Sequence, residues 1–328
     1  MSERFGPPIP NGWFAVAWSN DVAPGEVKSV HYFEQDLVIF RTETGEVHVL
    51  DAFCPHLGAH LGFGGTVVGE SLQCPFHAWQ WAGDGSCASI PYAKRIPPGA
   101  KIRSWRAQEL ADMIFVWHHI EDEPPFFDLP VLSELGSPSW TTPEHFDMTV
   151  KAHVQDMTEN NCDPVHFKYV HENDNVPESE VSYDGLTMHV ESVSNYETVA
   201  GSFDMKLVRD TWGLGLAAVR IEGIPDCGLM MFSSTSPVTR EKSDSRWIFT
   251  VTENLYDTAG KEFIQNLQEG VTQDYPIWEN KIHRPQPLLC DGDEFLAEYR
   301  RWASNFYSPP PAGSLAERPT VRRAGASR

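Results

Sequence analysis

Positive charge is scarce in this sequence. Among its 328 residues, 25 are Lys or Arg and 46 are Asp or Glu, which gives a formal net charge of −21 at pH 7. A nucleic-acid-binding protein needs a basic surface to displace counterions from phosphates, and an anionic membrane attracts basic surfaces as well. We therefore expect no nucleic-acid partner, whereas an acidic surface suits a basic partner protein.

Long apolar runs are also absent. Residues 1–11 are polar and proline-rich, and the longest apolar stretch near them covers only 13–18. A membrane-spanning helix needs about 20 apolar residues, and a secretory signal has an apolar segment of its own. The sequence thus predicts no integral membrane segment, and the cytoplasm is the expected location.

Cysteine is too dispersed for a small disulfide-stapled domain, because the six cysteines are scattered along the chain. Their thiols are therefore available as metal ligands. We find no internal repeat and no convincing dinucleotide-binding fingerprint.

Apolar residues (41%) and aromatic residues (12%) suffice for one or two hydrophobic cores. The first part of the chain contains short β-rich runs with turn residues between them, at 27–33, 37–41, 47–50 and 113–117. Proline and acidic residues at 121–125 predict a linker. We expect an all-β domain at 1–122, a second domain at 123–307 and a disordered tail at 308–328.

The second domain mixes helix and strand. Residues 152–171 carry helix formers interrupted near Asp163-Pro164, and 261–283 has a helical period. Between them, residues 185–255 contain alternating strand-like runs, such as 188–193, 214–221 and 247–251.

Two short segments each pair a cysteine with a histidine, Cys-Pro-His at 54–56 and Cys-Pro-Phe-His at 74–77. Zinc knuckles usually group Cys with Cys and His with His, whereas mixed pairs fit a Rieske [2Fe–2S] cluster, in which two Cys hold one iron and two His the other. A zinc site, or buried Cys and His without a metal, is the alternative. The predicted cluster ligands are Cys54, His56, Cys74 and His77.

A second group of polar residues follows the pattern Asn-x2-Asp-x2-His-x4-His, from Asn160 to His171. A spacing of five on a regular helix separates two side chains by about 140°, so His166 and His171 can share a site only if the helix bends or ends between them. Asp163 followed by proline is typical of a helix start, which predicts a new turn there. Alone, such a His pair is more often structural.

Asp274 is the only charged member of an otherwise apolar stripe on the predicted helix 261–283. A buried carboxylate is costly unless it is paired or bound to a metal. A salt bridge, or a helix break at Pro276, is one explanation. The other is that Asp274 completes a facial triad with His166 and His171, which leaves positions open for O2 on non-haem Fe(II). An electron carrier together with such an iron is what reductive O2 activation requires.

With these residues, the chain resembles the oxygenase component of Rieske non-haem iron oxygenases, and most of all the branch with 3-ketosteroid 9α-hydroxylase, bacterial sterol demethylases and cholesterol 7-desaturase. The resemblance covers most of residues 10–307. Besides the predicted ligands, it includes 74–81, 90–93, Gln273-Asp274, Ile277-Trp278, 287–290, Arg300-Arg301-Trp302 and Phe306-Tyr307.

The resemblance implies an α+β fold: an N-terminal all-β Rieske domain, then a helix-grip (START-like) catalytic domain whose antiparallel sheet curls around a long C-terminal helix. It also implies a homotrimer in which the cluster of one subunit faces the mononuclear iron of the next. Asp163 matches the family's bridging aspartate, which would relay electrons between His77 of the partner subunit and His166. Asn160 matches a helix position just upstream, without an assigned role.

The implied function is hydroxylation of a steroid or sterol by a mono-oxygenase that uses O2. Electrons would come from NAD(P)H through a separate ferredoxin/flavin reductase component. Desaturation, or stepwise oxidation of a sterol methyl group as in a demethylase, is possible on the same scaffold. A plain Rieske electron carrier and a non-catalytic steroid-binding protein are the remaining alternatives.

Overall fold

The structure is a computed structural model that describes residues 7–198, 201–223, 226–308 and 322–323. The chain forms two compact units. One is Trp13–Pro124, and the other combines Pro125–Arg328 with Met1–Gly12. The predicted linker at 121–125 coincides with the division between them.

The unit Trp13–Pro124 consists of three small antiparallel sheets, with the strand orders β1-β11-β10, β2-β3-β4-β9 and β5-β6-β7-β8. A short helix, η1, follows β1. The bounds are β1 Gly12–Trp18, η1 Ser19–Asp21, β2 Val27–Tyr32, β3 Gln35–Arg41, β4 Val47–Asp51, β5 Thr66–Val68, β6 Ser71–Gln73, β7 Gln80–Ala82, β8 Cys87–Ser89, β9 Ser104–Trp105, β10 Ala107–Leu110 and β11 Met113–His118. The four β-rich runs predicted here are confirmed as β2, β3, β4 and β11.

The core of this unit follows from its apolar strands. Every residue of β1 and β11 is buried, and Trp13 packs edge-on against Trp117 with ring centroids 5.6 Å apart. Burial of such aromatic side chains contributes on the order of 25 cal/mol per Å² of apolar surface removed from water. A second buried cluster includes Phe40, Leu72 and Trp81, which lie beside the Cys-His segments.

The other unit is built on an eight-stranded antiparallel sheet in the order β12-β18-β17-β16-β15-β14-β13-β19. Its strands are β12 Glu144–Val150, β13 Glu178–Asp184, β14 Thr187–Thr198, β15 Gly201–Trp212, β16 Leu216–Glu222, β17 Leu229–Thr239, β18 Lys242–Val251 and β19 Arg322–Arg323. Its helices are α1 Val154–Thr158, η2 Glu159–Cys162, α2 Val165–Tyr169, α3 Glu253–Thr272, α4 Tyr275–Asn280, α5 Glu294–Ala303 and η3 Ser304–Phe306. The expected α+β fold, with a helix laid across an antiparallel sheet, is confirmed.

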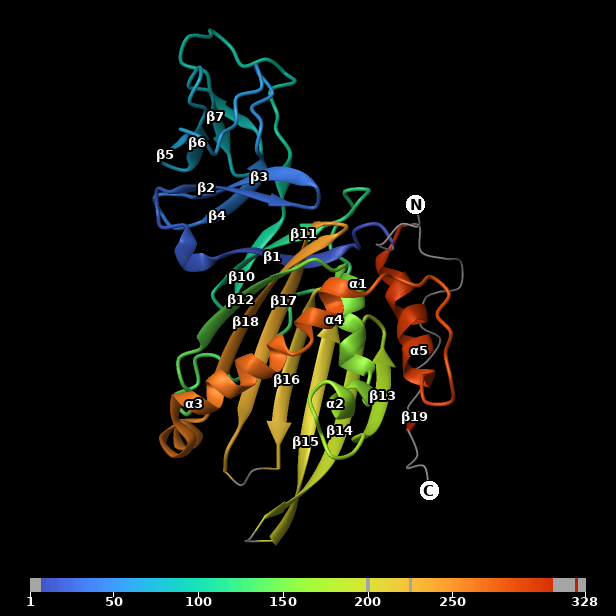
Figure 1. The fold of residues 1–328 in the computed structure, drawn as a ribbon. Coiled ribbons are helices and arrows are strands. Elements are labelled where there is room, and N and C mark those ends of the chain that lie inside the picture. The colour runs from blue at the N-terminus through green and yellow to red at the C-terminus, as the bar shows by residue number, and fades with distance from the viewer. Residues whose placement is uncertain (1–6, 199–200, 224–225, 309–321, 324–328) are drawn as a thin grey trace. The chain divides into compact units, whose positions relative to one another are not determined.

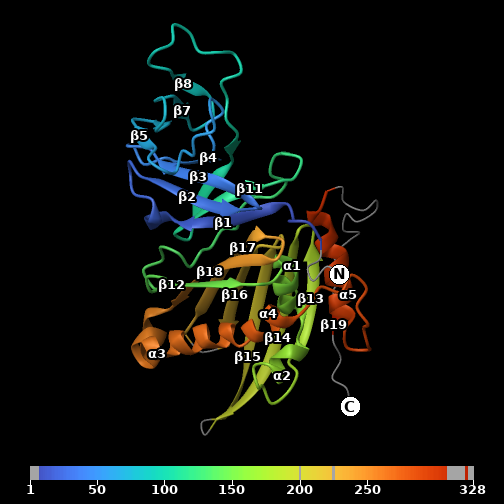
Figure 2. The ribbon, with the colours of Figure 1, turned by 45° about the horizontal axis from the view of Figure 1, so that its top comes forward.

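Helices α3 and α4 run across one face of this sheet, in front of its middle strands (Figures 1 and 2). Because side chains alternate along a strand, that face receives every second residue of β15, including Leu207 and Arg209. The next residue, Asp210, lies on the opposite face, where it forms ion pairs with His189 and Arg220. The helix-covered face therefore holds the cavity described below.

The predicted helix 261–283 was wrong in its bounds. Helix α3 begins at Glu253 and ends at Thr272, and α4 is a separate helix. Pro276 explains the break, since it has no N–H to donate to the carbonyl of Thr272 and its ring would clash with that carbonyl. The break leaves Asp274 between the two helices.

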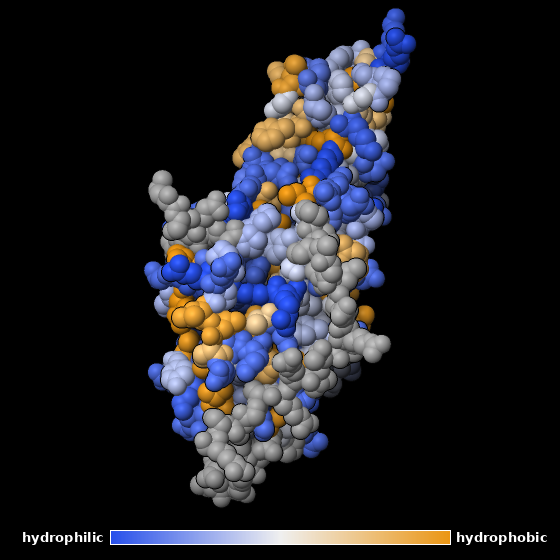
Figure 3. Space-filling view, turned by 90° about the vertical axis from the view of Figure 1, so that its right-hand side faces the viewer, coloured by the Kyte–Doolittle hydropathy of each residue, from blue (hydrophilic) through white to orange (hydrophobic). Residues whose placement is uncertain are grey.

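The interruption predicted at Asp163-Pro164 is confirmed, because η2 ends at Cys162 and α2 begins at Val165. The predicted disordered tail lies mostly outside the described residues; of its described part, Arg322–Arg323 pair with β13. None of the described helices has the length and apolar character needed to cross a bilayer. On the side that carries α5, hydrophobic residues form separate patches among hydrophilic ones (Figure 3).

Candidate functional site

The two Cys-His segments fold into matching loops, one after β4 and the other between β6 and β7. In the first, the carbonyl of Cys54 accepts from the N–H of Gly58, and in the second the carbonyl of Cys74 accepts from Ala78, at 2.9 and 3.0 Å. Gly58 and Ala78 both have positive φ, 76° and 57°. Since a non-glycine residue rarely adopts this conformation, the Cys74 loop is held in an unfavourable backbone shape by its surroundings.

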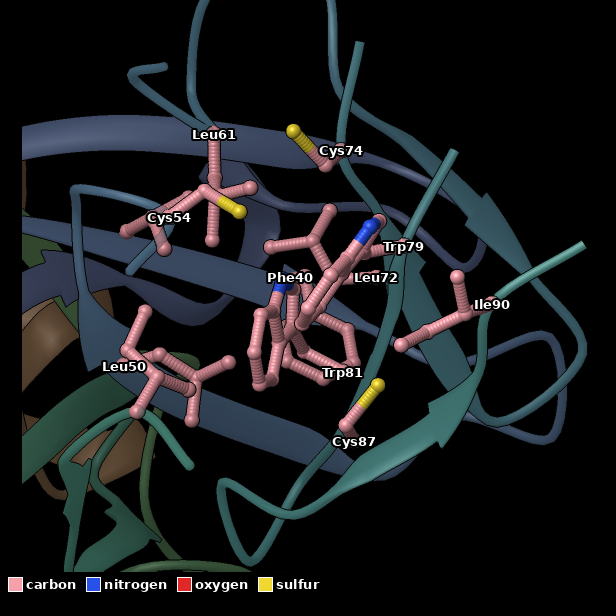
Figure 4. Packing of buried hydrophobic residues seen from close by; sticks show 12 residues of the cluster. Phe40, Leu50, Cys54, Leu61, Leu72, Cys74, Trp79, Trp81, Cys87 and Ile90 are labelled. Atoms are coloured by element: carbon pink, nitrogen blue, oxygen red, sulfur yellow. The ribbon is translucent and has the colours of Figure 1, made fainter. Parts of the chain in front are cut away.

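The two cysteines of these loops are neighbours, because Cys74 contributes to the pKa of the Cys54 thiol. Cys87 lies away from both of them, beyond Trp81 (Figure 4). Burial raises the pKa of the Cys54 thiol to about 11. A hydrogen bond from the backbone of His56 opposes this rise, and the neighbouring Cys74 adds to it. A bound metal would stabilise the thiolate against this cost.

The two histidines supply the second half of the set. The ring centroids of His56 and His77 are 4.7 Å apart, and both Nδ1 atoms are buried without a hydrogen-bond partner. A buried nitrogen in this state costs about 1–3 kcal/mol. A pair of neighbouring cysteines and a pair of neighbouring histidines with unpartnered nitrogens fit the ligand set of a Rieske cluster, which would satisfy both nitrogens.

The second group lies in the other unit. The structure brings together His166 from α2, His171 just after α2, and Asp274 from the break between α3 and α4. One ligand atom from each lies within 4.8 Å of the others, and Nε2 of His171 is 3.4 Å from Oδ2 of Asp274. Asp274 is 7% exposed. The α2 helix ends at Tyr169, which lets two histidines five residues apart face one point.

The Nδ1 atom of each histidine already has a hydrogen-bond partner. Nδ1 of His166 is 2.5 Å from the backbone carbonyl oxygen of Asp163, and Nδ1 of His171 is 2.8 Å from Oε1 of Gln273. Both acceptors require a proton on Nδ1, which leaves Nε2 of each ring as an acceptor. Metal-binding histidines characteristically donate their other N–H in this way. The three residues therefore fit a mononuclear iron.

The two histidines differ in electrostatics. Burial lowers the pKa of His166 despite the nearby carboxylates of Asp274 and Asp163. The hydrogen bond with Asp274 raises the pKa of His171, in spite of its partial burial.

Asp163 connects this site to the start of α2. Its Oδ1 accepts from the backbone N–H groups of Val165 and His166, at 2.9 and 3.4 Å, so it caps the helix as expected. Its Oδ2 lies 3.9 Å from Nδ1 of His166, farther than the backbone carbonyl. Asn160 lines the cavity next to this segment.

Gln273 is the residue whose role the sequence did not reveal. It precedes Asp274, and its contact with His171 joins segments about 100 residues apart. Replacing it with leucine, which has similar volume but no acceptor, is expected to weaken ferrous iron binding about 10- to 100-fold. Competition with a chelator measures this affinity. Gln273→Glu retains an acceptor and should bind iron nearly as the wild type does; equal affinity in Gln273→Leu would contradict the assigned hydrogen bond.

A cavity of about 490 Å³ opens beside His166, His171 and Asp274. Its volume is within the range of about 300–1,000 Å³ that is usual for small-molecule sites. Apolar side chains from four strands and α3 form much of its wall, including Met205, Leu207, Val219, Ile221, Met231, Trp247, Leu267 and Val271.

Comparison with known proteins gives matches over both units. The model of the Rieske [2Fe-2S] domain matches residues 12–105, and that of the 3-ketosteroid 9α-hydroxylase C-terminal domain matches residues 116–307. Cholesterol 7-desaturase nvd 1 of Ciona intestinalis is 31% identical, over 94% of this chain and 71% of the relative. The 3-ketosteroid-9-alpha-monooxygenase oxygenase component of Rhodococcus rhodochrous is 30% identical, over 90% of this chain and 79% of the relative.

Solved structures support the fold. The NdmA QL mutant of Pseudomonas putida CBB5 with caffeine has a TM-score of 0.77 at 18% identity, and the alignment covers 94% of this chain and 96% of that one. Dicamba monooxygenase bound to dicamba has a TM-score of 0.74 at 19% identity, with 90% and 97% covered.

Proposed function

Since this chain belongs to the 3-ketosteroid 9α-hydroxylase family of Rieske oxygenases, we propose that it is the oxygenase component of a mono-oxygenase that hydroxylates a steroid or sterol. The observation that carries the proposal is the placement of His166, His171 and Asp274 at the edge of a largely apolar cavity. An electron carrier alone would need no such arrangement.

Each set of side chains has a role in this proposal. Cys54, His56, Cys74 and His77 hold a [2Fe–2S] cluster, and His166, His171 and Asp274 hold Fe(II). When bound, the cluster supplies single electrons and the ferrous ion activates O2. Asp163 orients His166 through its backbone carbonyl, and its carboxylate lies on the electron path between the centres. Gln273 fixes the ring of His171.

The cavity wall orients the substrate. Side chains of Leu207, Val219 and Ile221 come from one sheet face, and Trp247 and Leu267 approach from β18 and α3. Such a wall excludes water and binds a rigid apolar ring system mainly through removal of apolar surface from water. The carbon presented to the metal then depends on the shape of this wall.

The proposed assembly is a homotrimer supplied with electrons from NAD(P)H by a separate reductase. In this trimer, Asp163 lies between two histidines: His166 of its own subunit and His77 of the partner subunit. A cytoplasmic location agrees with the free state of all six cysteines, since two of them must remain available to the cluster. Asp163 is 28% exposed at its side chain, which leaves it within reach of a partner.

Desaturation of a sterol is the second candidate outcome. It is favoured by the similarity to cholesterol 7-desaturases, at 31% identity over most of the chain for the relative from Ciona intestinalis. The same side chains would perform the same roles. The product would have two hydrogen atoms fewer than the substrate, whereas a hydroxylated product has one additional oxygen atom.

Turnover of a steroid and sterol panel tests the proposal. The protein is purified anaerobically and combined with a surrogate ferredoxin/flavin reductase, NADH and isotopically labelled O2. The expected product carries one labelled oxygen atom, detected by mass spectrometry; an unlabelled product lighter by two hydrogens would identify a desaturase. NADH consumption without any altered steroid or sterol would contradict both outcomes.

A further inference from the structure

Arg209 is a buried cation in the lining of the cavity. Arg209 lies on β15 and, with Met205 and Leu207, belongs to the alternate positions that line the cavity. It is 2% exposed, so bulk water hardly screens its charge. A guanidinium group at this depth is usually paired with a carboxylate.

No carboxylate pairs with Arg209 in the part of the chain that the structure describes. Its Nη2 donates to the hydroxyl of Ser192, which in turn lies 2.8 Å from the hydroxyl of Ser179. Its Nε and Nη1 are buried with no hydrogen-bond partner, and no ion pair of Arg209 is found within the described residues. Its Cζ atom lies 5.0 Å from the centre of the Phe167 ring, which covers one side of the guanidinium group.

The charge is retained at neutral pH. Burial lowers the pKa of Arg209 to about 10, and the neighbouring groups Cys162 and Asp163 oppose this decrease. The carboxylates in the cavity lining are Asp274, which faces His171, and Glu269, which is exposed. The charge of Arg209 lies in a region of low dielectric, where it attracts an anion strongly.

Arg209 is also close to the metal site. The ring centre of Phe167 is 5.0 Å from Cζ of Arg209 and 5.3 Å from the ring centre of His171. The guanidinium group and the metal-binding candidates therefore share an aromatic neighbour at the same cavity.

We propose that Arg209 binds an anionic oxygen group of the substrate, so that the enzyme prefers a steroid carboxylic acid over neutral steroids. The guanidinium group would donate charge-assisted hydrogen bonds to the carboxylate, while the apolar wall holds the rings. Arg209 is then a specificity-determining residue. This inference rests on the proposed function, from which it takes the steroid ring system of the substrate, and it concerns the same cavity.

Binding of a matched pair of ligands tests it. Calorimetry of the iron-loaded protein without O2 or reductase compares 3-oxoandrost-4-ene-17β-carboxylate with the corresponding carboxamide, which has the same shape and no charge. Hydrogen bonds to charged groups contribute about 1.5–3 kcal/mol, so the acid is expected to bind about 10- to 100-fold more tightly. Equal affinities, tighter binding of the amide, or no binding of either compound would overturn the proposal.

Variants locate the effect. Arg209→Gln should lose the preference for the acid and retain the affinity for the amide. Lys206→Gln removes a cation from the other face of β15, where it pairs with Glu191, and should change neither affinity. If Arg209→Gln weakens both ligands equally, Arg209 only shapes the cavity and the proposal fails. If that variant does not fold, the wild-type preference and Arg209→Lys, which should keep part of it, decide the question.

These results remain separate from the test of turnover. A preference for the acid without any oxygenated product would contradict the proposed function and leave the role of Arg209 intact. Hydroxylation of neutral steroids with no preference for the acid would support the function and refute the role of Arg209.

Discussion

Replacing His171 with alanine is expected to remove the mononuclear iron and abolish O2-dependent turnover while leaving the [2Fe–2S] cluster in place. His171 faces Asp274 at 3.4 Å, and it lies in a different unit from Cys54 and His56. Replacing a residue that only orients a metal ligand typically lowers metal affinity or activity about 10- to 100-fold. Loss of a ligand itself should therefore lower turnover more than about 100-fold. Iron analysis should fall from about three atoms per chain to about two, with an unchanged visible spectrum.

His189→Ala is the matched control for this variant. His189 is also a histidine of the same unit, but it lies on the opposite face of the sheet, where Nδ1 contacts Asp210 at 2.7 Å. We expect this control to retain all of its iron and its turnover. Full activity in His171→Ala, or loss of the cluster together with the mononuclear iron, would contradict the assignment of two separate centres.

Replacing Asp163 with asparagine is expected to slow electron transfer to the mononuclear site without removing iron. The backbone carbonyl that holds His166 is unaffected by this change, and the asparagine side-chain oxygen can still accept from Val165. Only the negative charge is lost. We expect oxidation of a pre-reduced cluster by O2, in the presence of substrate, to slow about 10- to 100-fold in a stopped-flow measurement at the visible cluster bands.

Two further variants interpret that result. Asp163→Ala also removes the cap of α2 and should lose iron in addition to rate. Asp174→Asn removes a charge from the exposed segment after α2 and should behave like the wild type. If Asp163→Asn transfers electrons at the wild-type rate, the carboxylate is not part of the electron path.

The side chains proposed to bind metal were the most predictable part of this protein. Cysteine and histidine at fixed spacing within short loops are constrained by the coordination of a metal, so local sequence carries the information. Asp274 could be inferred as well, because a single carboxylate in an apolar stripe has few explanations. The sequence predicted that Asp274 lies beside His166 and His171, and the structure brings these three residues together.

The exact helix bounds and the supporting contacts were less predictable. Helix α3 was expected to continue through Pro276, because the apolar period persists across the break. Gln273 and Arg209 gain their roles from contacts with segments far away in sequence. Strand β15 lies within the range 185–255 where strand-like runs were predicted, but the pattern did not indicate that Arg209 points into a cavity. Tertiary contacts of this kind leave no local periodicity.

The central claim is that the chain holds two distinct iron centres, and Mössbauer spectroscopy of protein enriched in ⁵⁷Fe tests it most directly. After anaerobic purification and reconstitution, the account predicts the signals of a Rieske cluster together with a high-spin ferrous signal, in a ratio of about two irons to one. Loss of the ferrous signal in Asp274→Ala, with the cluster signals unchanged, completes the prediction. A spectrum of the wild type that contains the cluster alone, with no ferrous signal after reconstitution, would contradict it.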